Sequence, residues 1–599
     1  MNIVAERLSK LREVMKREGA DWFFCTSDDF HCSEYVADYY KVREYYTGFT
    51  GENAFLLMNA KEAKMWTDGR FFIQAERELA GSGVDLMRMG DAGVPTIKEY
   101  IKANVKDKET LFFDGRAVST ALGKDICRLM EKKNGKVVCD RDIAGDLWEN
   151  RPALPSSKVF ILPDEVTGES VTSKLARIRE KMEEYDAKCH FITSLDDIMW
   201  ITNLRANDIE CNPVALSYLY ITDKTAVLFL QKSESSAEVA DYLKKNNIEL
   251  KVYEEVFDFL NGVKVPGSVL LDLNRVNYLS FLTLSKKAEI VNKANPSALM
   301  KAIKNKTEIA RLKEAYIEDS VCVSKFAYWL KKNVGKMEIT ELSAADYIDT
   351  LRSKVDGFIE LSFPTISGYG PNAAMMHYSA TPDNFSVVKP EGMLLVDSGG
   401  QYMKGTTDVT RTYAVGSVTD EMRLHYSKTA SGMLALADAR FLYGCTGKNV
   451  DILARLPLWE LNIDYKCGTG HGVGYILNVH EGPHSIRWKF AEGAAEAALE
   501  EGMIVSDEPG VYLEGKYGIR IENVILCEKG ELNSDGQFMK FEHLTLSPLD
   551  KDLLDVKYLS EKDVERVNAY HKLVFEKTSK YFEGEELDWL KEACAPIYK

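Results

Sequence analysis

The chain has 599 residues, of which 45% are hydrophobic and 28% charged, so it is too apolar for a disordered protein and too long for a single core. Its formal net charge of −16 provides no overall positive field, which excludes nucleic acid as an expected partner. The 11 cysteines form no C-x-x-C pair, so reduced thiols in the cytoplasm are favoured over a disulfide framework or a thiolate zinc site.

The most apolar stretches argue against export and against a membrane span. The apolar run at residues 3–5 is far shorter than the hydrophobic region of a signal peptide. The run at residues 213–221 ends at Thr222, whereas a membrane-spanning helix needs roughly 20 apolar residues. We therefore expect a cytoplasmic protein that has no membrane partner.

Two segments of the N-terminal half resemble each other. Residues 8–29 recur at residues 175–196, and in each copy a helical apolar face leads into a β-rich run. The residues of these faces are Leu8, Leu11 and Met15 in the first copy and Leu175, Ile178 and Met182 in the second. The repetition predicts two related α/β domains.

Loop-rich segments mark the ends of both copies and the start of a third domain. The stretch NRPALPSSK begins at Asn150, and Asn-Pro-Ser begins at Asn295. A long amphipathic helix is expected next, with Asn305 as its N-cap and Glu308 in its first turn. The predicted domains are residues 1–155, 156–297 and 298–599.

A second amphipathic helix is predicted near the end of the chain. Ser560 and Asp563 fit its first turn. His571 is a lone histidine on its apolar face, which predicts a core histidine and not a metal ligand.

Residues 393–415 have the alternation of two strands around a glycine-rich connection, which predicts a hairpin. Asp397 ends the first strand, and Asp408 is placed within the second, on the face that carries Thr410. Aspartate is depleted in strands and costly to bury unpaired, so something must compensate these carboxylates if they are buried. Taken singly, each could instead be a solvent-facing edge or turn residue.

Three further polar positions follow in apolar or glycine-rich segments. His471 lies in GTGHGVG, Glu508 in SDEPGVY and Glu522 in YGIRIENV. Arg520 precedes Glu522 by two residues, so on one strand its guanidinium is predicted to lie beside that carboxylate and help to keep it ionised.

These positions include a candidate metal centre, which consists of Asp397, Asp408, His471, Glu508 and Glu522. Four carboxylates brought together would repel one another and take up protons unless about four positive charges lay among them, which two divalent cations supply. Oxygen ligands with a single nitrogen and no sulfur favour Mn²⁺, with Zn²⁺ or Co²⁺ as alternatives.

The order of the motifs resembles one family of enzymes. The chain carries, in this order, VDSGG, TTDVTRT, GTGHGVG, NVHEGP, SDEPGVY and YGIRIENV. This series is similar to that of the dinuclear metallopeptidases with the pita-bread fold, specifically the Xaa-Pro aminopeptidases (aminopeptidase P) in their long, three-domain cytosolic form. The resemblance implies a fold of two creatinase-like N-terminal α/β domains followed by an α+β pita-bread catalytic domain with a helical extension.

The resemblance also assigns the five ligands to two ions. It implies that Asp397 binds one ion, that His471 and Glu508 bind the other, and that Asp408 and Glu522 bridge both. A hydroxide shared by the two ions would then attack the peptide carbonyl carbon.

Catalytic roles follow from the same resemblance. Glu508 is implied to be the general base and later the proton donor. His377 and His480 match the family's catalytic histidines and would hold the substrate and stabilise the tetrahedral intermediate. Arg520 has a supporting role.

Two segments complicate the match. Cys467 stands where many eukaryotic members carry a histidine, and it is interpreted as a small apolar filler, with a weak thiol ligand as the alternative. The segment HEGPH at residues 480–484 fits the single-zinc H-E-x-x-H pattern, but Gly482 and Pro483 break the helix that this pattern needs.

The activity implied by the resemblance is removal of the N-terminal residue from peptides that have proline in the second position, by a homodimer formed through the catalytic domain. Two alternatives stay open. One is an Xaa-Pro dipeptidase of the prolidase type, and the other is a non-catalytic pita-bread module that binds peptides or proteins.

Overall fold

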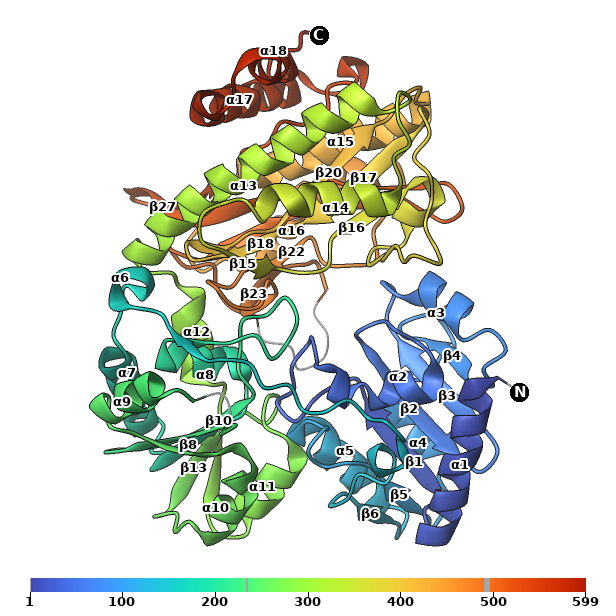
Figure 1. The fold of residues 1–599 in the computed structure, drawn as a ribbon, viewed down its shortest axis with the longest axis vertical. Coiled ribbons are helices and arrows are strands. Elements are labelled where there is room, and N and C mark those ends of the chain that lie inside the picture. Colours follow the sequence, from blue (N-terminus) through green and yellow to red (C-terminus); the bar gives the residue numbers. More distant parts are fainter. Residues whose placement is uncertain (1, 233–234, 490–495) are drawn as a thin grey trace. The chain divides into compact units, whose positions relative to one another are not determined.

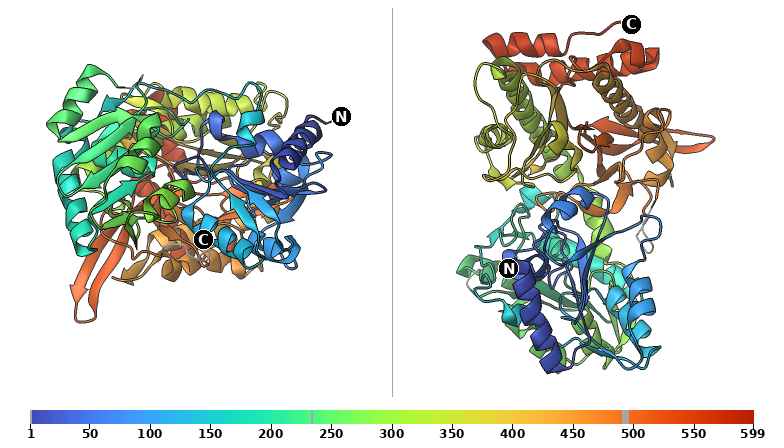
Figure 2. Two further views of the ribbon diagram at one scale, coloured as in Figure 1. Left: turned by 90° about the horizontal axis from the view of Figure 1, so that it is seen from below. Right: turned by 90° about the vertical axis from the view of Figure 1, so that its right-hand side faces the viewer.

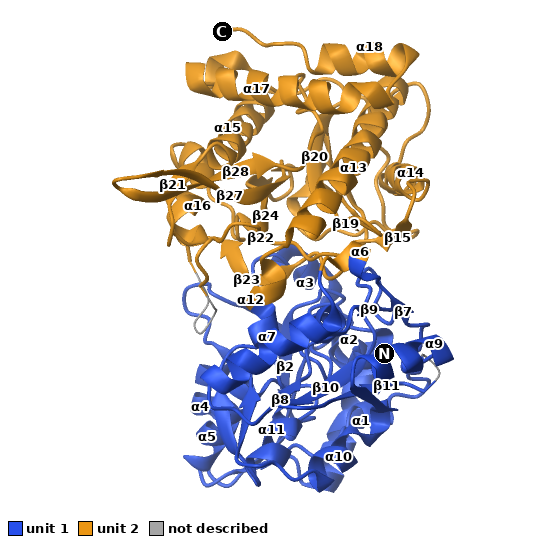
Figure 3. Ribbon diagram, turned by 90° about the vertical axis from the view of Figure 1, so that its left-hand side faces the viewer, with its two compact units in different colours: residues 1–164, 169–298 blue, residues 165–168, 299–599 orange. Residues whose placement is uncertain are grey.

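The protein is described by a computed structural model that covers residues 2–232, 235–489 and 496–599. It divides into two compact units: residues 1–164 with 169–298, and residues 165–168 with 299–599 (Figure 3). Within the described residues, no helix combines the length and apolar character that a membrane crossing would require.

The first unit contains two six-stranded sheets. In the first, the strand order is β4-β3-β2-β1-β5-β6. Helix α1 is capped at its N-terminus by Asn2, whose side chain accepts a hydrogen bond from the Val4 N–H. The strands are β1 (Trp22–Thr26), β2 (Ala54–Asn59), β3 (Ala63–Thr67), β4 (Asp85–Arg88), β5 (Thr110–Phe112) and β6 (Lys136–Val138). The helices are α1 (Ile3–Glu18), α2 (Val42–Thr47), α3 (Phe72–Glu78), α4 (Ile97–Asn104) and α5 (Thr120–Glu131) (Figure 1).

The second sheet repeats the order of the first, as β12-β11-β10-β8-β13-β14. Its strands are β8 (Cys189–Ile192), β10 (Ser217–Thr222), β11 (Ala226–Leu230), β12 (Ile248–Val252), β13 (Ser268–Leu271) and β14 (Glu289–Asn292). The remaining elements of this region are β7 (Phe160–Ile161), β9 (Leu204–Arg205), α6 (Asp164–Thr167), α7 (Val171–Glu184), α8 (Leu195–Thr202), α9 (Ala237–Lys245), α10 (Val256–Gly262), α11 (Tyr278–Ser285) and α12 (Pro296–Ala302). The shared order confirms the relationship that the sequence repeat predicted.

The repeat extends to individual hydrogen bonds. Arg12 in α1 donates through Nε to the carbonyl of Asn59, at 3.0 Å. Arg179, its counterpart in α7, donates through Nε to the carbonyl of Thr222, at 2.9 Å. In both copies the arginine therefore fastens the helix to the end of the neighbouring antiparallel strand.

The two copies contact each other through equivalent segments. The Thr120 N–H donates to the carbonyl of Val276, and the Tyr278 N–H donates to the carbonyl of Val118, both at 2.9 Å. Residues 118–120 lead into α5 and residues 276–278 lead into α11, so the same part of each copy binds its counterpart reciprocally. This reciprocity is that of a contact around a twofold axis.

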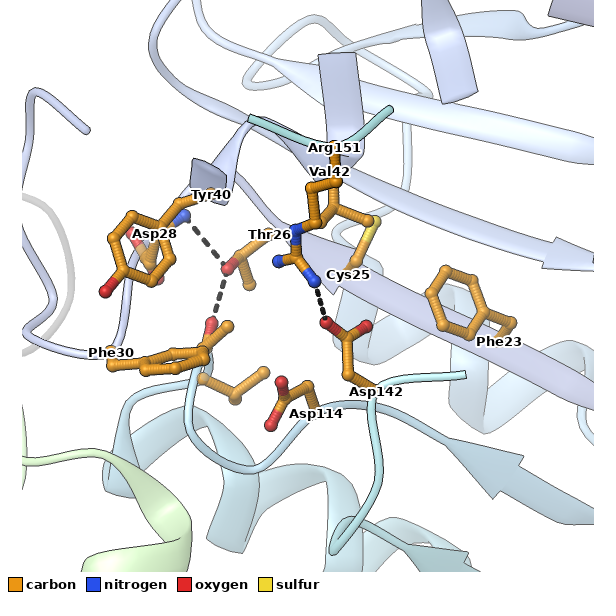
Figure 4. Close-up of a pocket in the computed structure, with 12 residues that line it drawn as sticks. Phe23, Cys25, Thr26, Asp28, Phe30, Tyr40, Val42, Asp114, Asp142 and Arg151 are labelled. Carbon is orange, nitrogen blue, oxygen red and sulfur yellow. Dashed lines mark hydrogen bonds and ion pairs between the residues drawn. The ribbon is translucent and has the colours of Figure 1, made fainter. Parts of the chain in front are cut away.

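A small cavity in the first copy is lined by apolar and aromatic side chains together with a few charged ones (Figure 4). Its volume is about 30 Å³, enough for one or two water molecules. Arg151 donates to Asp142 across its wall at 2.8 Å, while Asp28 and Asp114 line other sides. The ion pair partly compensates the burial of Asp142, and Asp114 is paired with Arg116 at 2.8 Å.

The second unit is built on antiparallel sheets, with the orders β15-β18-β19, β16-β17-β20, β21-β28-β27-β24-β22-β23 and β25-β26. The strands up to β21 are β15 (Phe358–Leu361), β16 (Ile366–Tyr369), β17 (Met393–Ser398), β18 (Gly400–Tyr402), β19 (Gly405–Thr406), β20 (Val409–Ala414) and β21 (Arg440–Leu442). The later strands are β22 (Gly470–Gly472), β23 (Glu481–Ile486), β24 (Ile504–Asp507), β25 (Gly510–Leu513), β26 (Tyr517–Arg520), β27 (Asn523–Asn533) and β28 (Gly536–His543).

Helices pack against these sheets and form a further layer at one end of the unit. The helices are α13 (Lys306–Asn333), α14 (Glu341–Arg352), α15 (Asp420–Ala437), α16 (Gly447–Trp459), α17 (Glu561–Thr578) and α18 (Gly584–Ala593). Helices α17 and α18, drawn in red in Figure 2, pack against α13, and α17 also contacts α15. The core beneath them includes Tyr426, Val567 and Val574.

The predicted beginnings of two helices are confirmed. Asn305 caps α13, and the Glu308 carboxylate accepts a hydrogen bond from the Asn305 N–H. Ser560 and Asp563 form the same reciprocal arrangement at the start of α17. His571 is fully buried and its Nε2 accepts a hydrogen bond from the Leu549 N–H, so it is a core histidine as predicted.

Candidate metal centre

Asp397 lies in β17, and Asp408 directly precedes β20, the strand that pairs with β17. The predicted pairing is confirmed, with Asp397 opposite Thr410. The prediction that Asp408 lies within a strand is wrong, because it lies between β19 and β20, which belong to different sheets. Next to Asp408 the backbone passes close to Gly399, where an added Cβ atom would lie 2.0 Å from the Thr407 carbonyl oxygen.

The other three predicted ligands come from the strands of the second half of the unit. His471 lies in β22, Glu508 directly follows β24, and Glu522 lies between β26 and β27. His471 Nε2 is 3.5 Å from Asp408 Oδ2 and 3.4 Å from Glu508 Oε1. Ligand atoms of Asp408, His471 and Glu522 lie within 4.8 Å of one another, which is a spacing that one metal ion can bridge.

Burial and mutual repulsion disfavour the charged forms of these carboxylates. Burial raises the pKa of Asp408 well above its ordinary value, and the negative charges of Asp397 and Glu508 raise it further. Burial likewise raises the pKa of Glu508 to about 7. For Glu522, burial and then the charge of Asp408 raise the pKa. Without added positive charge, the cluster would therefore hold protons at neutral pH.

The residues present fit divalent cations. Asp397 Oδ1 and Glu522 Oε1 are buried and have no hydrogen-bond partner within the described part of the chain. Because a buried carboxylate oxygen without a partner is costly, both atoms need a cation or a bound donor. Four carboxylates and one imidazole supply mostly oxygen ligands, which suit Mn²⁺ or a similar hard ion.

Arg520 neutralises a different carboxylate from the one predicted. Its Nε donates to Asp397 Oδ2 at 3.1 Å, and its Nη2 also contacts that oxygen. Glu522 Oε2 instead accepts a hydrogen bond from the Thr410 hydroxyl at 2.8 Å. Arg520 is the last residue of β26, so the alternation of strand faces does not extend to Glu522.

Two residues of this site were missed in the sequence. The Tyr512 hydroxyl accepts a hydrogen bond from Arg520 Nη1 at 2.9 Å. Pairing of Gly510 with Arg520 in the β25–β26 hairpin would have placed Tyr512 close to that arginine. Ser506 Oγ accepts from the His471 N–H at 3.0 Å and donates to Glu508 Oε1 at 3.1 Å, and no pattern in the sequence indicated this.

The two predicted catalytic histidines are half-buried. The His480 ring lies perpendicular to that of His471, with 4.3 Å between the ring centroids. His377 directly follows Met376, whose carbonyl accepts a hydrogen bond from Arg520 Nη2 at 3.4 Å. His480 is thus beside His471, a predicted ligand. The backbone next to His377 contacts Arg520, which binds Asp397, another predicted ligand.

The HEGPH segment and Cys467, which complicated the resemblance, both have structural roles. Residues 481–486 form strand β23 and not the helix that a single-zinc pattern needs, as predicted. The Glu481 carboxylate is held by Lys301, at 3.2 Å, and by Lys304. Cys467 is half-buried and packs against the hydrophobic core of the unit, where a small filler is expected.

Comparison with known families agrees with this architecture. Residues 7–138 and 150–308 match creatinase/prolidase N-terminal domain families. Residues 310–529 match metallopeptidase family M24, and residues 537–597 match the C-terminal region of M24 peptidases. The fold and the acidic cluster thus define a metallopeptidase of family M24 with two creatinase-type N-terminal domains, which confirms the predicted fold class.

Individual relatives identify the family within this class of metallopeptidases. Proteins named probable Xaa-Pro aminopeptidase P from Talaromyces marneffei and Laccaria bicolor are 36% and 35% identical, over 99% of this chain and 92% and 93% of theirs. The X-prolyl aminopeptidase of Caenorhabditis elegans, described as a cytosolic enzyme with a di-nuclear active site, is 31% identical over 100% of both chains, with a TM-score of 0.95. The chain belongs to the Xaa-Pro aminopeptidase family. It is a metalloaminopeptidase, as predicted.

Proposed function

We propose that this protein hydrolyses the bond before proline at the second position of peptides, using two divalent metal ions bound by the predicted ligands. The observation that carries the proposal is the convergence of Asp408, His471 and Glu522 within 4.8 Å. The names of the fungal relatives and the di-nuclear site of the Caenorhabditis elegans enzyme support it. Proline at this position needs a dedicated enzyme because its amide lacks an N–H and its φ is fixed.

Each ligand has a proposed place. Asp397 would hold one ion, His471 and Glu508 would hold the other, and Asp408 and Glu522 would be shared by both. Four carboxylates balance the charge of two divalent ions, and the oxygen-rich set favours Mn²⁺ over Zn²⁺ or Co²⁺. The contact of Arg520 with Asp397 Oδ2 leaves Asp397 Oδ1 available as a ligand atom.

Two ions held by these residues would lower the pKa of a coordinated water to near neutrality and so would supply a hydroxide nucleophile. Glu508 accepts the proton of this water and passes it to the proline nitrogen when the carbon–nitrogen bond breaks. His377 and His480 hold the substrate carbonyl and stabilise the oxyanion that develops on it. The free amine of the peptide would approach the two bound ions, which explains cleavage after one residue.

Metal removal and a peptide series test the proposal. After exhaustive chelation the enzyme should be inactive, and Mn²⁺ should restore its activity. Xaa-Pro-Yaa should then be cleaved about 100-fold faster than Xaa-Ala-Yaa, because a site that accommodates the proline ring discriminates against a smaller side chain. Chromatographic quantification of released amino acid provides the measurement. Activity that survives metal removal would contradict the mechanism, and cleavage restricted to the dipeptide Xaa-Pro would select the dipeptidase alternative.

We also propose a homodimer that forms through one face of α16. Ile452, Leu456 and Trp459 lie along this face and are 39%, 50% and 38% exposed. Trp488, 48% exposed, places its ring 6.3 Å from that of Trp459. Exposed apolar side chains gathered in this way are typical of a protein interface.

A charge within this face should separate the protomers. We expect Leu456→Asp to convert a dimer into a monomer in analytical ultracentrifugation, because an ionised carboxylate would be buried without a partner. Leu532→Asp is the matched control, since Leu532 is 73% exposed on the β27–β28 hairpin and should leave the dimer intact. A monomeric wild-type protein, or a dimeric Leu456→Asp variant, would refute this interface.

We further propose the domain division at residues 155/156 and 297/298 and a cytoplasmic location. The boundary between the two compact units, at residues 298 and 299, supports the second division. The 11 cysteines form no disulfide in the part of the chain that the structure describes, which supports a reducing compartment, as does the cytosolic relative from Caenorhabditis elegans.

A further inference from the structure

The loop that precedes β22 is bound to α16 through Arg455, whose guanidinium pairs with Asp451 on the helix and with Asp464 on the loop, at 2.7 Å in both cases. Arg455 Nε donates to Asp451 Oδ2 at 2.7 Å, and both side chains are 0% exposed. The same guanidinium donates through Nη1 to the carbonyl of Tyr465, at 2.9 Å, and through Nη2 to the carbonyl of Cys467, at 2.7 Å. The loop backbone is therefore held at two points by a side chain whose own position Asp451 fixes.

Thr469 connects this ion pair to the candidate metal centre. Its hydroxyl donates to the free oxygen of Asp451, Oδ1, at 2.5 Å, so the Tyr465 hydroxyl, 2.6 Å away, donates to it in turn. The carbonyl of Thr469 accepts a hydrogen bond from the Glu508 N–H at 2.8 Å. One residue thus touches both the α16 ion pair and the backbone of a proposed ligand.

The neighbouring contacts tie the two ligands of one ion together. Gly470 approaches the Ser506 carbonyl so closely that a Cβ atom would lie 1.8 Å from its oxygen. The Ser506 hydroxyl accepts from the His471 N–H and donates to Glu508 Oε1. Any displacement of the Thr469 backbone would therefore change the separation of His471 from Glu508.

We propose that Thr469, held by Asp451 and Arg455, is a positioning residue of the metal centre. Its hydroxyl fixes the peptide group to which Glu508 is bonded, so that Glu508 and His471 stay close enough to bind one ion despite the repulsion among the carboxylates. The inference rests on the proposed function, because it assigns these two side chains to a shared ion. Groups that orient ligands without touching the metal commonly change its affinity 10- to 100-fold.

Binding of Mn²⁺ alone to the full-length, metal-free protein tests the proposal. Free Mn²⁺ would be followed by electron paramagnetic resonance during titration of wild type, Thr469→Val and Thr469→Ser. Valine keeps the shape and removes the hydroxyl, so we expect about a tenfold weaker affinity for one of the two ions. Serine restores the hydroxyl and should bind within about twofold of wild type. At saturating Mn²⁺, the kcat of Thr469→Val should recover, because Thr469 does not touch the substrate.

A matched variant separates positioning from a general loss of stability. Thr429 is equally buried, and its hydroxyl donates within α15 to the carbonyl of His425 at 2.8 Å. Thr429→Val should lose comparable thermal stability without a change in Mn²⁺ affinity. If Thr469→Val does not fold, Asp451→Asn can be tested instead. This change weakens the acceptor of the Thr469 hydroxyl's hydrogen bond, so the affinity for Mn²⁺ should also fall.

The possible failures are distinguishable. Wild-type affinity in Thr469→Val or in Asp451→Asn, or an equal loss in Thr429→Val, overturns the positioning role while the metal-dependent activity of the wild type stands. A wild-type protein that binds no Mn²⁺ at all overturns the proposed function first, and the positioning role with it.

Discussion

Replacing Asp408 by asparagine should lower peptidase activity about a thousandfold, because loss of a ligand shared by two ions removes several kcal/mol of transition-state stabilisation. The same substitution should raise the melting temperature of the metal-free protein. In that state burial and the charges of Asp397 and Glu508 raise the pKa of Asp408, so at neutral pH folding must protonate a carboxyl group that is ionised in the unfolded chain, and a neutral amide avoids that cost. Stabilisation by added Mn²⁺ should largely disappear.

The measurements are thermal unfolding with and without Mn²⁺, metal content after dialysis, and cleavage of Xaa-Pro-Yaa. Asp507→Asn provides the control, because this neighbouring carboxyl group is fully buried and its pKa is also raised well above the ordinary value by burial, yet it is not a proposed ligand. It should retain metal and activity. An Asp408→Asn enzyme with normal metal content and normal turnover would remove the basis of the proposed centre.

Replacing Arg411 by methionine should be the most damaging change to the stability of the second unit. Arg411 is buried in β20 and donates to the carbonyls of Thr410, Glu522, Ser547 and Pro548, and to the side chains of Asn523 and Tyr570. Each buried oxygen left without a donor costs about 1–3 kcal/mol, so the free energy of unfolding should fall by about 3 kcal/mol or more. Because Glu522 loses a backbone contact, Mn²⁺ affinity should fall as well.

Hydrogen exchange of the full chain, measured by mass spectrometry, shows which segments lose stability in Arg411→Met. Exchange should accelerate in β20 and in residues 545–550, where the guanidinium joins separate segments. Arg440→Met is the control at an exposed position on β21 and should change stability by less than about 0.5 kcal/mol. Exchange in Arg411→Met that matches wild type in both segments would mean that the guanidinium does not hold them together.

Local patterns predicted the elements of this protein better than the contacts between them. Alternation predicted the β17–β20 hairpin, and the spacing of Asn305 and Glu308 predicted the start of α13, because both are set by neighbouring residues. The position of Asp408 was wrong because alternation holds only within one strand, and the chain changes sheets there. The partner of Arg520 was also wrong, since Asp397 is far away in the sequence and only the paired sheets bring it near.

The candidate site was predictable mainly through charge. Four acidic residues in apolar or glycine-rich surroundings indicated that cations must compensate them, whichever exact contacts they make. Tyr512, Ser506 and Thr469 carry no such indication, because hydroxyl groups are common in strands and loops of any function. Their roles depend on which backbone groups lie opposite them, and this is determined by packing.

The sequence repeat also has a consequence for how the N-terminal half assembles. Residues 118–120 and 276–278 bind each other reciprocally, in the manner of two identical subunits. Here both halves belong to one polypeptide, so they meet at the effective concentration set by the tether between them and not at the concentration of protein in solution. Dilution that dissociates separate chains should leave this internal pair intact.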